Sequence, residues 1–102
     1  MIAEIEQRRA ELEGLCRRFG VRRLDVFGSA AAGELPSEES DVDLLVEFEP
    51  PIGQGYADRY FGLLEALEAL FGRPVDLVVD SAITNPYFRE SVTRSRVALY
   101  AA

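Results

Sequence analysis

The sequence contains no histidine and only one cysteine, Cys16. These absences exclude a zinc site, Ser-His-Asp chemistry and a Cys-His dyad, and they leave carboxylates as the available metal ligands. Cys16 has no second cysteine with which to form an internal disulfide. Because it falls on the apolar face of the first expected helix, we expect it to contribute to packing.

Basic residues and long apolar runs are also scarce. The chain carries 11 basic and 18 acidic residues, a net charge of −7. Since binding to nucleic acid phosphates requires a basic face, free nucleic acid is excluded as the expected partner, and a nucleotide would have to enter together with a metal ion. Apolar stretches are only a few residues long, so we expect neither a transmembrane span nor a signal peptide, and we expect a cytoplasmic protein. With 102 residues, 48% of them hydrophobic, the chain is expected to form one domain over residues 1–102.

The pattern of apolar residues and breakers predicts alternating helices and strands. Residues 34–40, between the helical turn expected at 30–32 and the strand expected at 41–48, read as a polar, acidic loop. The resulting order indicates an α/β (α+β) fold in which helices pack on a small mixed β-sheet. The expected helices cover residues 2–19, 58–71 and 85–94, with a brief helical turn at 30–32, and the expected strands cover 24–27, 41–48, 75–79 and 97–100.

Asp41 and Asp43 form an Asp-x-Asp motif in the clearest predicted strand. Side chains two residues apart on a strand share one face, so the two carboxylates are expected to lie side by side and repel each other. A divalent cation relieves this repulsion, and Mg²⁺ prefers a few carboxylates together with phosphate oxygens. The alternative interpretation is that Asp41 starts the strand and Asp43 is a solvated edge residue.

Two further features strengthen the metal–nucleotide interpretation. Gly28 and Ser29 follow a predicted strand, where glycine lets the backbone approach a ligand and the serine hydroxyl can bind phosphate. Asp76 lies inside the apolar run VDLVV, where a charge is costly unless it is paired, metal-bound or solvent-facing. The simpler alternatives are an ordinary strand-to-helix turn for the first feature and a solvated edge aspartate for the second.

The segments FGSAAAGELPSEESDVDLLVEFEP and GRPVDLVV resemble the DNA polymerase β-like nucleotidyltransferase superfamily, whose signature is Gly-Ser, a spacer, Asp-x-Asp and a third downstream Asp. Within it, the chain is similar to the minimal nucleotidyltransferase family over nearly its whole length. The resemblance implies that Gly28 and Ser29 bind the triphosphate of ATP. It also implies that Asp41 and Asp43 bind Mg²⁺ and that Asp76 is the third acidic residue, a metal ligand or a base.

The resemblance further implies an antitoxin that transfers AMP from ATP to a tyrosine of a HEPN-domain RNase toxin. The acidic surface suits a basic partner. One position departs from the family, because Ala32 stands where an arginine is expected. Alanine provides neither charge nor donor, so weaker nucleotide binding is expected. A protein of this fold that neutralises its toxin by binding alone is therefore the alternative. An enzyme that modifies a small molecule fits less well, because such enzymes usually carry an added substrate domain.

Overall fold

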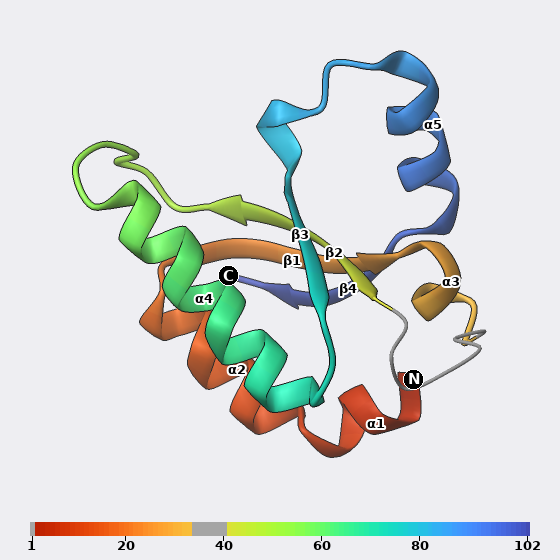
Figure 1. Ribbon diagram of the computed structural model, residues 1–102, viewed down its shortest axis with the longest axis horizontal. Helices are drawn as coiled ribbons and strands as arrows, with labels where there is room; N and C mark the ends of the chain where they lie inside the picture. Colours follow the sequence, from red (N-terminus) through yellow and green to blue (C-terminus); the bar gives the residue numbers. More distant parts are fainter. Residues whose placement is uncertain (1, 34–40) are drawn as a thin grey trace.

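The structure is a computed structural model that describes residues 2–33 and 41–102 (Figure 1). The acidic loop expected at 34–40 lies outside the described residues. The helices are α1 (Ile2–Gln7), α2 (Arg9–Arg18), α3 (Gly28–Ala31), α4 (Tyr56–Phe71), the short 3₁₀ helix η1 (Asp80–Ala82) and α5 (Pro86–Ser95), and the strands are β1 (Val21–Phe27), β2 (Val42–Phe48), β3 (Val75–Val79) and β4 (Val97–Ala101).

The strands form one four-stranded sheet in the order β3-β2-β1-β4. Strand β1 runs antiparallel to both β2 and β4, whereas β2 and β3 are parallel. The parallel pair requires a crossover connection, and α4 supplies it. The expected α/β class with a small mixed sheet is therefore confirmed.

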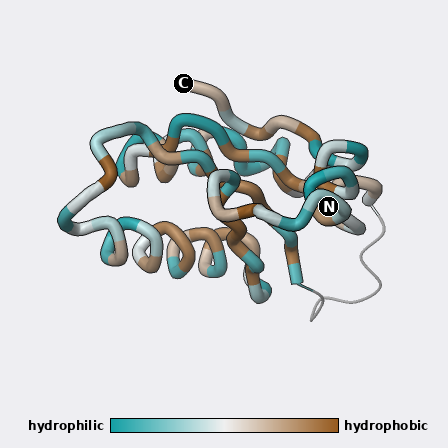
Figure 2. Tube along the Cα trace, turned by 90° about the horizontal axis from the view of Figure 1, so that it is seen from above, coloured by the Kyte–Doolittle hydropathy of each residue, from teal (hydrophilic) through white to brown (hydrophobic). Residues whose placement is uncertain are grey.

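The main core lies between the sheet and the helices α2 and α4. Val42, Leu44 and Val46 alternate along β2, so they point to the same face of the sheet and are all fully buried. Leu12 of α2 and Leu63 of α4 belong to the same buried cluster. Figure 2 shows brown, apolar residues along the inner sides of these layers. This packing fixes β2 as a rigid central strand.

A smaller cluster covers the opposite face. Phe27, Leu45 and Val92 are buried together there, and the ring of Phe88 meets that of Phe27 edge to face at 6.0 Å. Val92 and Phe88 belong to α5, which Figure 1 shows across the strands from α2 and α4. The side chain of Asn85 caps α5 by accepting hydrogen bonds from the backbone N–H groups of Tyr87 and Phe88, and the helix expected over 85–94 is confirmed.

Some element boundaries differ from the sequence-based expectations. The first helix is interrupted at Arg8, and nothing in the structure explains the break. Strand β1 begins at Val21, because Gly20 adopts a φ of 67° and turns the chain directly from helix to strand. Among the residues that the structure describes, no helix is long and apolar enough to cross a membrane.

Cys16 is buried in the main core, which confirms its predicted packing role. Burial raises the pKa of its thiol to about 12. The side chain therefore stays protonated at neutral pH and is a poor nucleophile.

Candidate active site

Asp43 and Asp76 lie opposite each other on neighbouring strands. They are register partners in the parallel pairing of β2 and β3, so their side chains project from the same face of the sheet. Asp43 is half-buried and Asp76 is exposed. Asp43 is also the register partner of Phe27, the last residue of β1. The sheet thus brings the second and third predicted acidic residues together, next to the end of β1.

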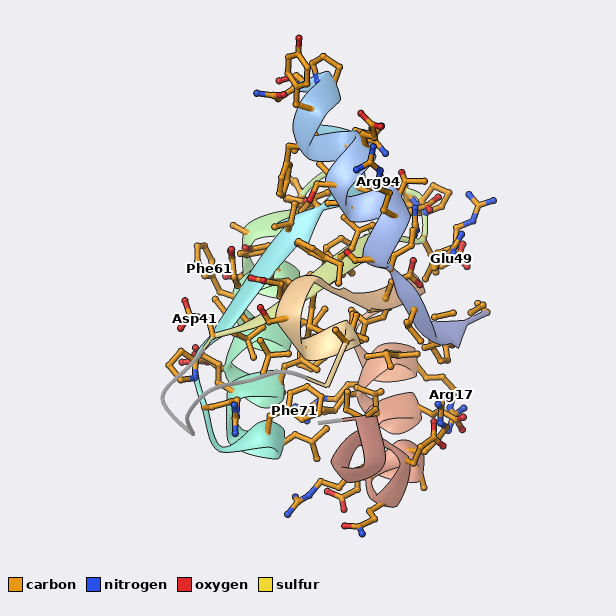
Figure 3. The ribbon with its side chains drawn as sticks, turned by 90° about the vertical axis from the view of Figure 1, so that its right-hand side faces the viewer. Arg17, Asp41, Glu49, Phe61, Phe71 and Arg94 are labelled. Atoms are coloured by element: carbon orange, nitrogen blue, oxygen red, sulfur yellow. The ribbon has the colours of Figure 1, made fainter. Side chains whose placement is uncertain are left out.

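Asp41 immediately precedes β2 and is exposed at the surface, as Figure 3 shows. The pKa of Asp43 is raised, first by burial and then by the negative charges of Asp76 and Asp41. All three carboxylates are therefore electrostatic neighbours. Within residues 2–33 and 41–102 none of the three takes part in an ion pair or hydrogen bond. The site carries an excess of negative charge that the described part of the chain does not neutralise.

The Gly28–Ser29 turn touches this acidic group. Gly28 has a φ of 67°, and a Cβ atom there would lie 2.8 Å from Oδ2 of Asp43. Such a distance is shorter than a normal contact, so a Cβ atom would displace the Asp43 carboxylate, and the positive φ separately favours glycine. Ser29 follows at the start of the four-residue helix α3 and is exposed. The turn and the Asp-x-Asp motif therefore form one continuous surface.

Ser95, at the end of α5, holds this turn from the other side. The backbone N–H of Gly28 donates a hydrogen bond to Oγ of Ser95 at 3.0 Å, and the Ser95 hydroxyl donates to the carbonyl of Ser91 at 3.2 Å. The N–H of Gly28 is therefore directed at α5. Sequence reasoning missed Ser95 because the two residues are 67 positions apart and no local pattern signals the contact.

A fourth aspartate, Asp25 on β1, has a different environment. Its side chain is completely buried and forms ion pairs with Arg23, at 3.1 Å, and with Arg96, the residue that follows Ser95. Sequence reasoning did not single it out, although a charge within the apolar run LDVF was a signal. Because Asp25 is neutralised by two arginines, we assign it a structural role in attaching the end of α5 to the sheet.

The acidic group fits a Mg²⁺ ion that is completed by a nucleotide. In the described part of the chain, no three acidic side chains converge closely enough to form a complete metal cage. Mg²⁺ does not require one, because it is commonly held by one or two carboxylates together with substrate phosphates and water. Asp43 and Asp76, with Asp41 beside them, provide such a partial ligand set, and their mutual repulsion favours a cation.

Comparison with known proteins agrees with this geometry. The model of the nucleotidyltransferase domain family matches residues 9–99. The protein adenylyltransferase MntA of Thermococcus cleftensis is 46% identical over 76 residues, which cover 72% of this chain and 71% of that protein. A solved structure named "Structure of putative minimal nucleotidyltransferase" is 41% identical, with a TM-score of 0.72, and the match covers 90% of this chain and 89% of that one.

A more distant solved structure shares the fold. It contains a tri-AMPylated Shewanella oneidensis HEPN toxin in complex with an MNT antitoxin, is 16% identical and superposes with a TM-score of 0.64 over 96% of this chain and 73% of that chain. The family model covers most of the sequence, and the acidic pair and the Gly28–Ser29 turn lie within it. The chain therefore belongs to the nucleotidyltransferase family, and within it to the minimal nucleotidyltransferases.

Proposed function

We propose that this protein is an antitoxin that transfers AMP from ATP to a tyrosine of a HEPN-domain RNase toxin. The observation that carries the proposal is the cross-strand pair of Asp43 and Asp76, which touches the Gly28–Ser29 turn and lacks a cationic partner in the described chain. The names of the relatives add support, since one is a protein adenylyltransferase and one solved complex contains an AMPylated HEPN toxin.

The geometry suggests a role for each residue. Asp41 and Asp43 would bind Mg²⁺, with Asp76 as a third ligand or as the base, and the ion would neutralise charge on the triphosphate and in the transition state. Ser29 would bind the triphosphate through its hydroxyl and backbone N–H. Because the N–H of Gly28 is bonded to Ser95, Gly28 would contribute space next to Asp43 instead of a hydrogen bond to phosphate.

The transfer is an in-line displacement at the α-phosphorus of ATP. The tyrosine oxygen forms a new bond to the α-phosphorus, and the bond between that phosphorus and the α–β bridging oxygen breaks. Pyrophosphate leaves with the bonding electron pair. Asp76, the exposed member of the acidic pair, accepts the proton of the tyrosine hydroxyl.

The acidic chain and the expected chemistry also indicate the charge of the partner and the cellular location. A net charge of −7 favours a basic protein partner over free nucleic acid. Dependence on ATP and Mg²⁺ and action on an RNase both fit a cytoplasmic location.

The test uses ATP labelled at the α-phosphate, Mg²⁺ and the protein product of the adjacent gene as the candidate HEPN-domain partner. We expect label on a tyrosine of that protein and loss of labelling in the Asp43→Asn variant. Glu11→Gln, which removes an exposed acidic group from α2, is the matched control and should label normally. Absence of label with the wild-type protein, or equal labelling by Asp43→Asn, would reject the proposal.

Neutralisation by binding alone is the second candidate, and Ala32 favours it. Ala32 is exposed at the end of α3, where the family pattern predicts an arginine that could contact phosphate. This candidate predicts a tight complex with the HEPN-domain protein and no label. If the missing guanidinium is the cause, Ala32→Arg should increase both Mg²⁺-dependent ATP binding and labelling.

A further inference from the structure

A groove runs along the outer edge of β3, between this strand and α4. Its volume is about 410 Å³, and its walls are mainly aromatic and aliphatic. Phe61 lies at its lip with 59% of its surface exposed, and its ring meets that of Tyr60 edge to face at 5.1 Å. The groove is also lined by the side chains of Tyr56, Ala57, Leu77 and Val79. The groove thus offers an open apolar surface at a sheet edge.

The groove and the acidic site share the outer strand β3. The hydroxyl of Tyr60 donates a hydrogen bond to the carbonyl of Leu77, the residue that follows Asp76. The pKa of Tyr60 is raised by burial and, next, by the negative charge of Asp76. Figure 3 shows Asp41 and Phe61 on the same side of the molecule. Leu77 and Val79 alternate with Asp76 along β3, so the groove lies on the α4 side of the sheet and the Asp76 side chain projects on the α5 side. The groove and the third acidic residue are therefore separated by the outer strand β3.

Exposed acidic side chains lie near the groove on α4 and β3. Asp58 and Glu65 lie three residues before and four residues after Phe61 on α4, so each is one helical turn away from it. Asp76 adds a third exposed carboxylate. In the described chain none of these three forms an ion pair, so the rim attracts cationic groups.

The order of the strands places the groove on the side from which an acceptor must approach. Crossing the sheet from β1 to β3 on the α5 side, one meets the Gly28–Ser29 turn, then Asp43 and then Asp76. The groove lies on the α4 side of the same outer strand, β3. An in-line displacement requires the leaving group and the attacking oxygen on opposite sides of the phosphorus. With the triphosphate at the turn, pyrophosphate would leave toward β1 and the attacking hydroxyl would approach from the outer edge of β3, around which a segment bound in the groove would reach the α5 side.

We propose that this groove is the docking site for the segment of the partner protein that carries the acceptor hydroxyl. An apolar or aromatic side chain of that segment occupies the groove, and neighbouring lysine or arginine side chains contact the acidic rim. This inference rests on the proposed function, because it takes the acceptor to be a protein and the phosphates to lie at the Gly28–Ser29 turn.

Two variants test the groove with little risk to folding. Phe61→Ala removes a largely exposed side chain, and Ala57→Gln fills the groove from an exposed position with a good helix former and no change of charge. Val97→Ala on β4, at the opposite edge of the sheet, is the matched control because Val97 is also an exposed apolar residue. The protein product of the adjacent gene, as the candidate HEPN-domain partner, serves as the probe.

Three quantities are measured for each variant: the Kd of the complex, the rate of AMP transfer to the HEPN-domain protein, and the Kd for Mg-ATP. We expect both groove variants to raise the Kd of the complex, and the KM for the protein acceptor, about tenfold, as truncation of an interface anchor does. Binding of Mg-ATP should stay unchanged, and Val97→Ala should match the wild type.

The outcomes separate this inference from the proposed function. Normal complex formation and transfer by both groove variants would overturn the docking site and leave the transfer activity intact. A complex that the groove variants weaken, without any AMP transfer by the wild type, would support the docking site and reject the proposed activity. Absence of any complex with the wild type would overturn the docking site.

Discussion

Two aspartates on adjacent strands, Asp25 and Asp43, show how surroundings separate a structural carboxylate from a functional one. Asp25 is completely buried and is paired with Arg23 and Arg96. Asp43 is half-buried, faces Asp76 and Asp41, and has no cationic partner in the described residues. Burial with neutralisation stabilises a fold, whereas burial next to like charges destabilises it unless a ligand supplies the opposite charge.

The first prediction concerns the stability of Asp43→Asn. Because the pKa of Asp43 is raised in the folded state, the folded protein binds this proton more tightly than the unfolded chain. Ionised Asp43 therefore destabilises the fold at neutral pH. We expect Asp43→Asn to increase the free energy of unfolding at pH 7 by on the order of 0.5 kcal/mol, measured by urea unfolding without metal.

The pH dependence provides the check on this prediction. The gain should be complete above the raised pKa of Asp43 and should disappear as the pH falls below the usual aspartate value of 3.8. As a contrast, Asp25→Asn should lower stability by about 2–4 kcal/mol, because it breaks a buried ion pair. A loss of stability in Asp43→Asn at neutral pH would contradict this prediction, because it would mean that the folded protein stabilises the ionised Asp43 carboxylate.

The second prediction uses two glycines with similar backbones. Gly28 and Gly33 have φ values of 67° and 78°, but an added Cβ meets Oδ2 of Asp43 only at Gly28 and meets nothing within 4 Å at Gly33. Replacement by alanine should cost about 1–2 kcal/mol at either position because of the backbone. Gly28→Ala should cost at least about 1 kcal/mol more, measured by urea unfolding, because it crowds the carboxylate. Equal losses would show that the turn and Asp43 are not in contact.

At the scale of elements, α5 attaches to the site through its last turn. Ser95 accepts the hydrogen bond from Gly28, and Arg96 pairs with Asp25. Val92 and Phe88 meanwhile pack near Phe27, which directly precedes the turn. Helix α5 therefore fixes the position of the Gly28–Ser29 turn through Ser95.

The third prediction is that Ser95→Ala impairs nucleotide binding more than stability. Loss of the hydroxyl frees the Gly28 N–H and loosens the turn, so we expect the KM for ATP to rise several-fold while the unfolding free energy falls by about 1 kcal/mol. Ser95→Thr retains a hydroxyl and should restore the KM. Thr93→Ala, which removes an equivalent hydroxyl bonded to the carbonyl of Arg89 on the same helix, should leave the KM unchanged. A rise in KM with Thr93→Ala as large as that with Ser95→Ala would assign the effect to the helix in general.

The sequence predicted these elements well where local signals exist. The apolar pattern located α4 and β2, and the helix expected over 85–94 matches α5 closely. Boundaries were missed where charged residues occupy strand positions. Arg22 and Arg23 belong to β1 although they look like loop residues, because this part of the strand exposes them to solvent.

The sequence did not predict the contacts between elements. The edges of the sheet are covered by side chains of distant helices: Arg9 donates to the carbonyl of Leu99 on β4, and Glu68 accepts from the N–H of Val75 on β3. Such contacts depend on helix orientation, which no local pattern specifies. The contact of Ser95 with Gly28 and the groove between β3 and α4 also depend on helix orientation, so the sequence did not predict them. The Asp-x-Asp motif and the Gly-Ser turn are local patterns, and the sequence predicted both.

At the scale of the whole molecule, the acidic surface is expected to guide a basic partner. The net charge is −7, and exposed carboxylates lie near the groove. The fourth prediction is that association with the HEPN-domain protein slows about tenfold between roughly 50 mM and 500 mM salt, because screening removes long-range attraction. Stopped-flow measurement of the association rate checks it. A salt-independent rate would show that the acidic surface does not steer the partner.

The fold as a whole brings the ends of three strands together at one place. Gly28 follows β1, Asp43 lies near the start of β2, and Asp76 lies near the start of β3. No single segment contains the site, so its function depends on the register between β2 and β3. The central claim is that this register creates a Mg²⁺-dependent nucleotide site.

Calorimetric titration with ATP, in the presence and absence of Mg²⁺, tests this claim most directly. We predict that the wild-type protein binds ATP only with Mg²⁺ and that Asp43→Asn and Asp76→Asn both abolish this Mg²⁺-dependent binding. Equal binding of Mg-ATP by the wild type and both variants would contradict it, since the two carboxylates would then play no part in holding the nucleotide.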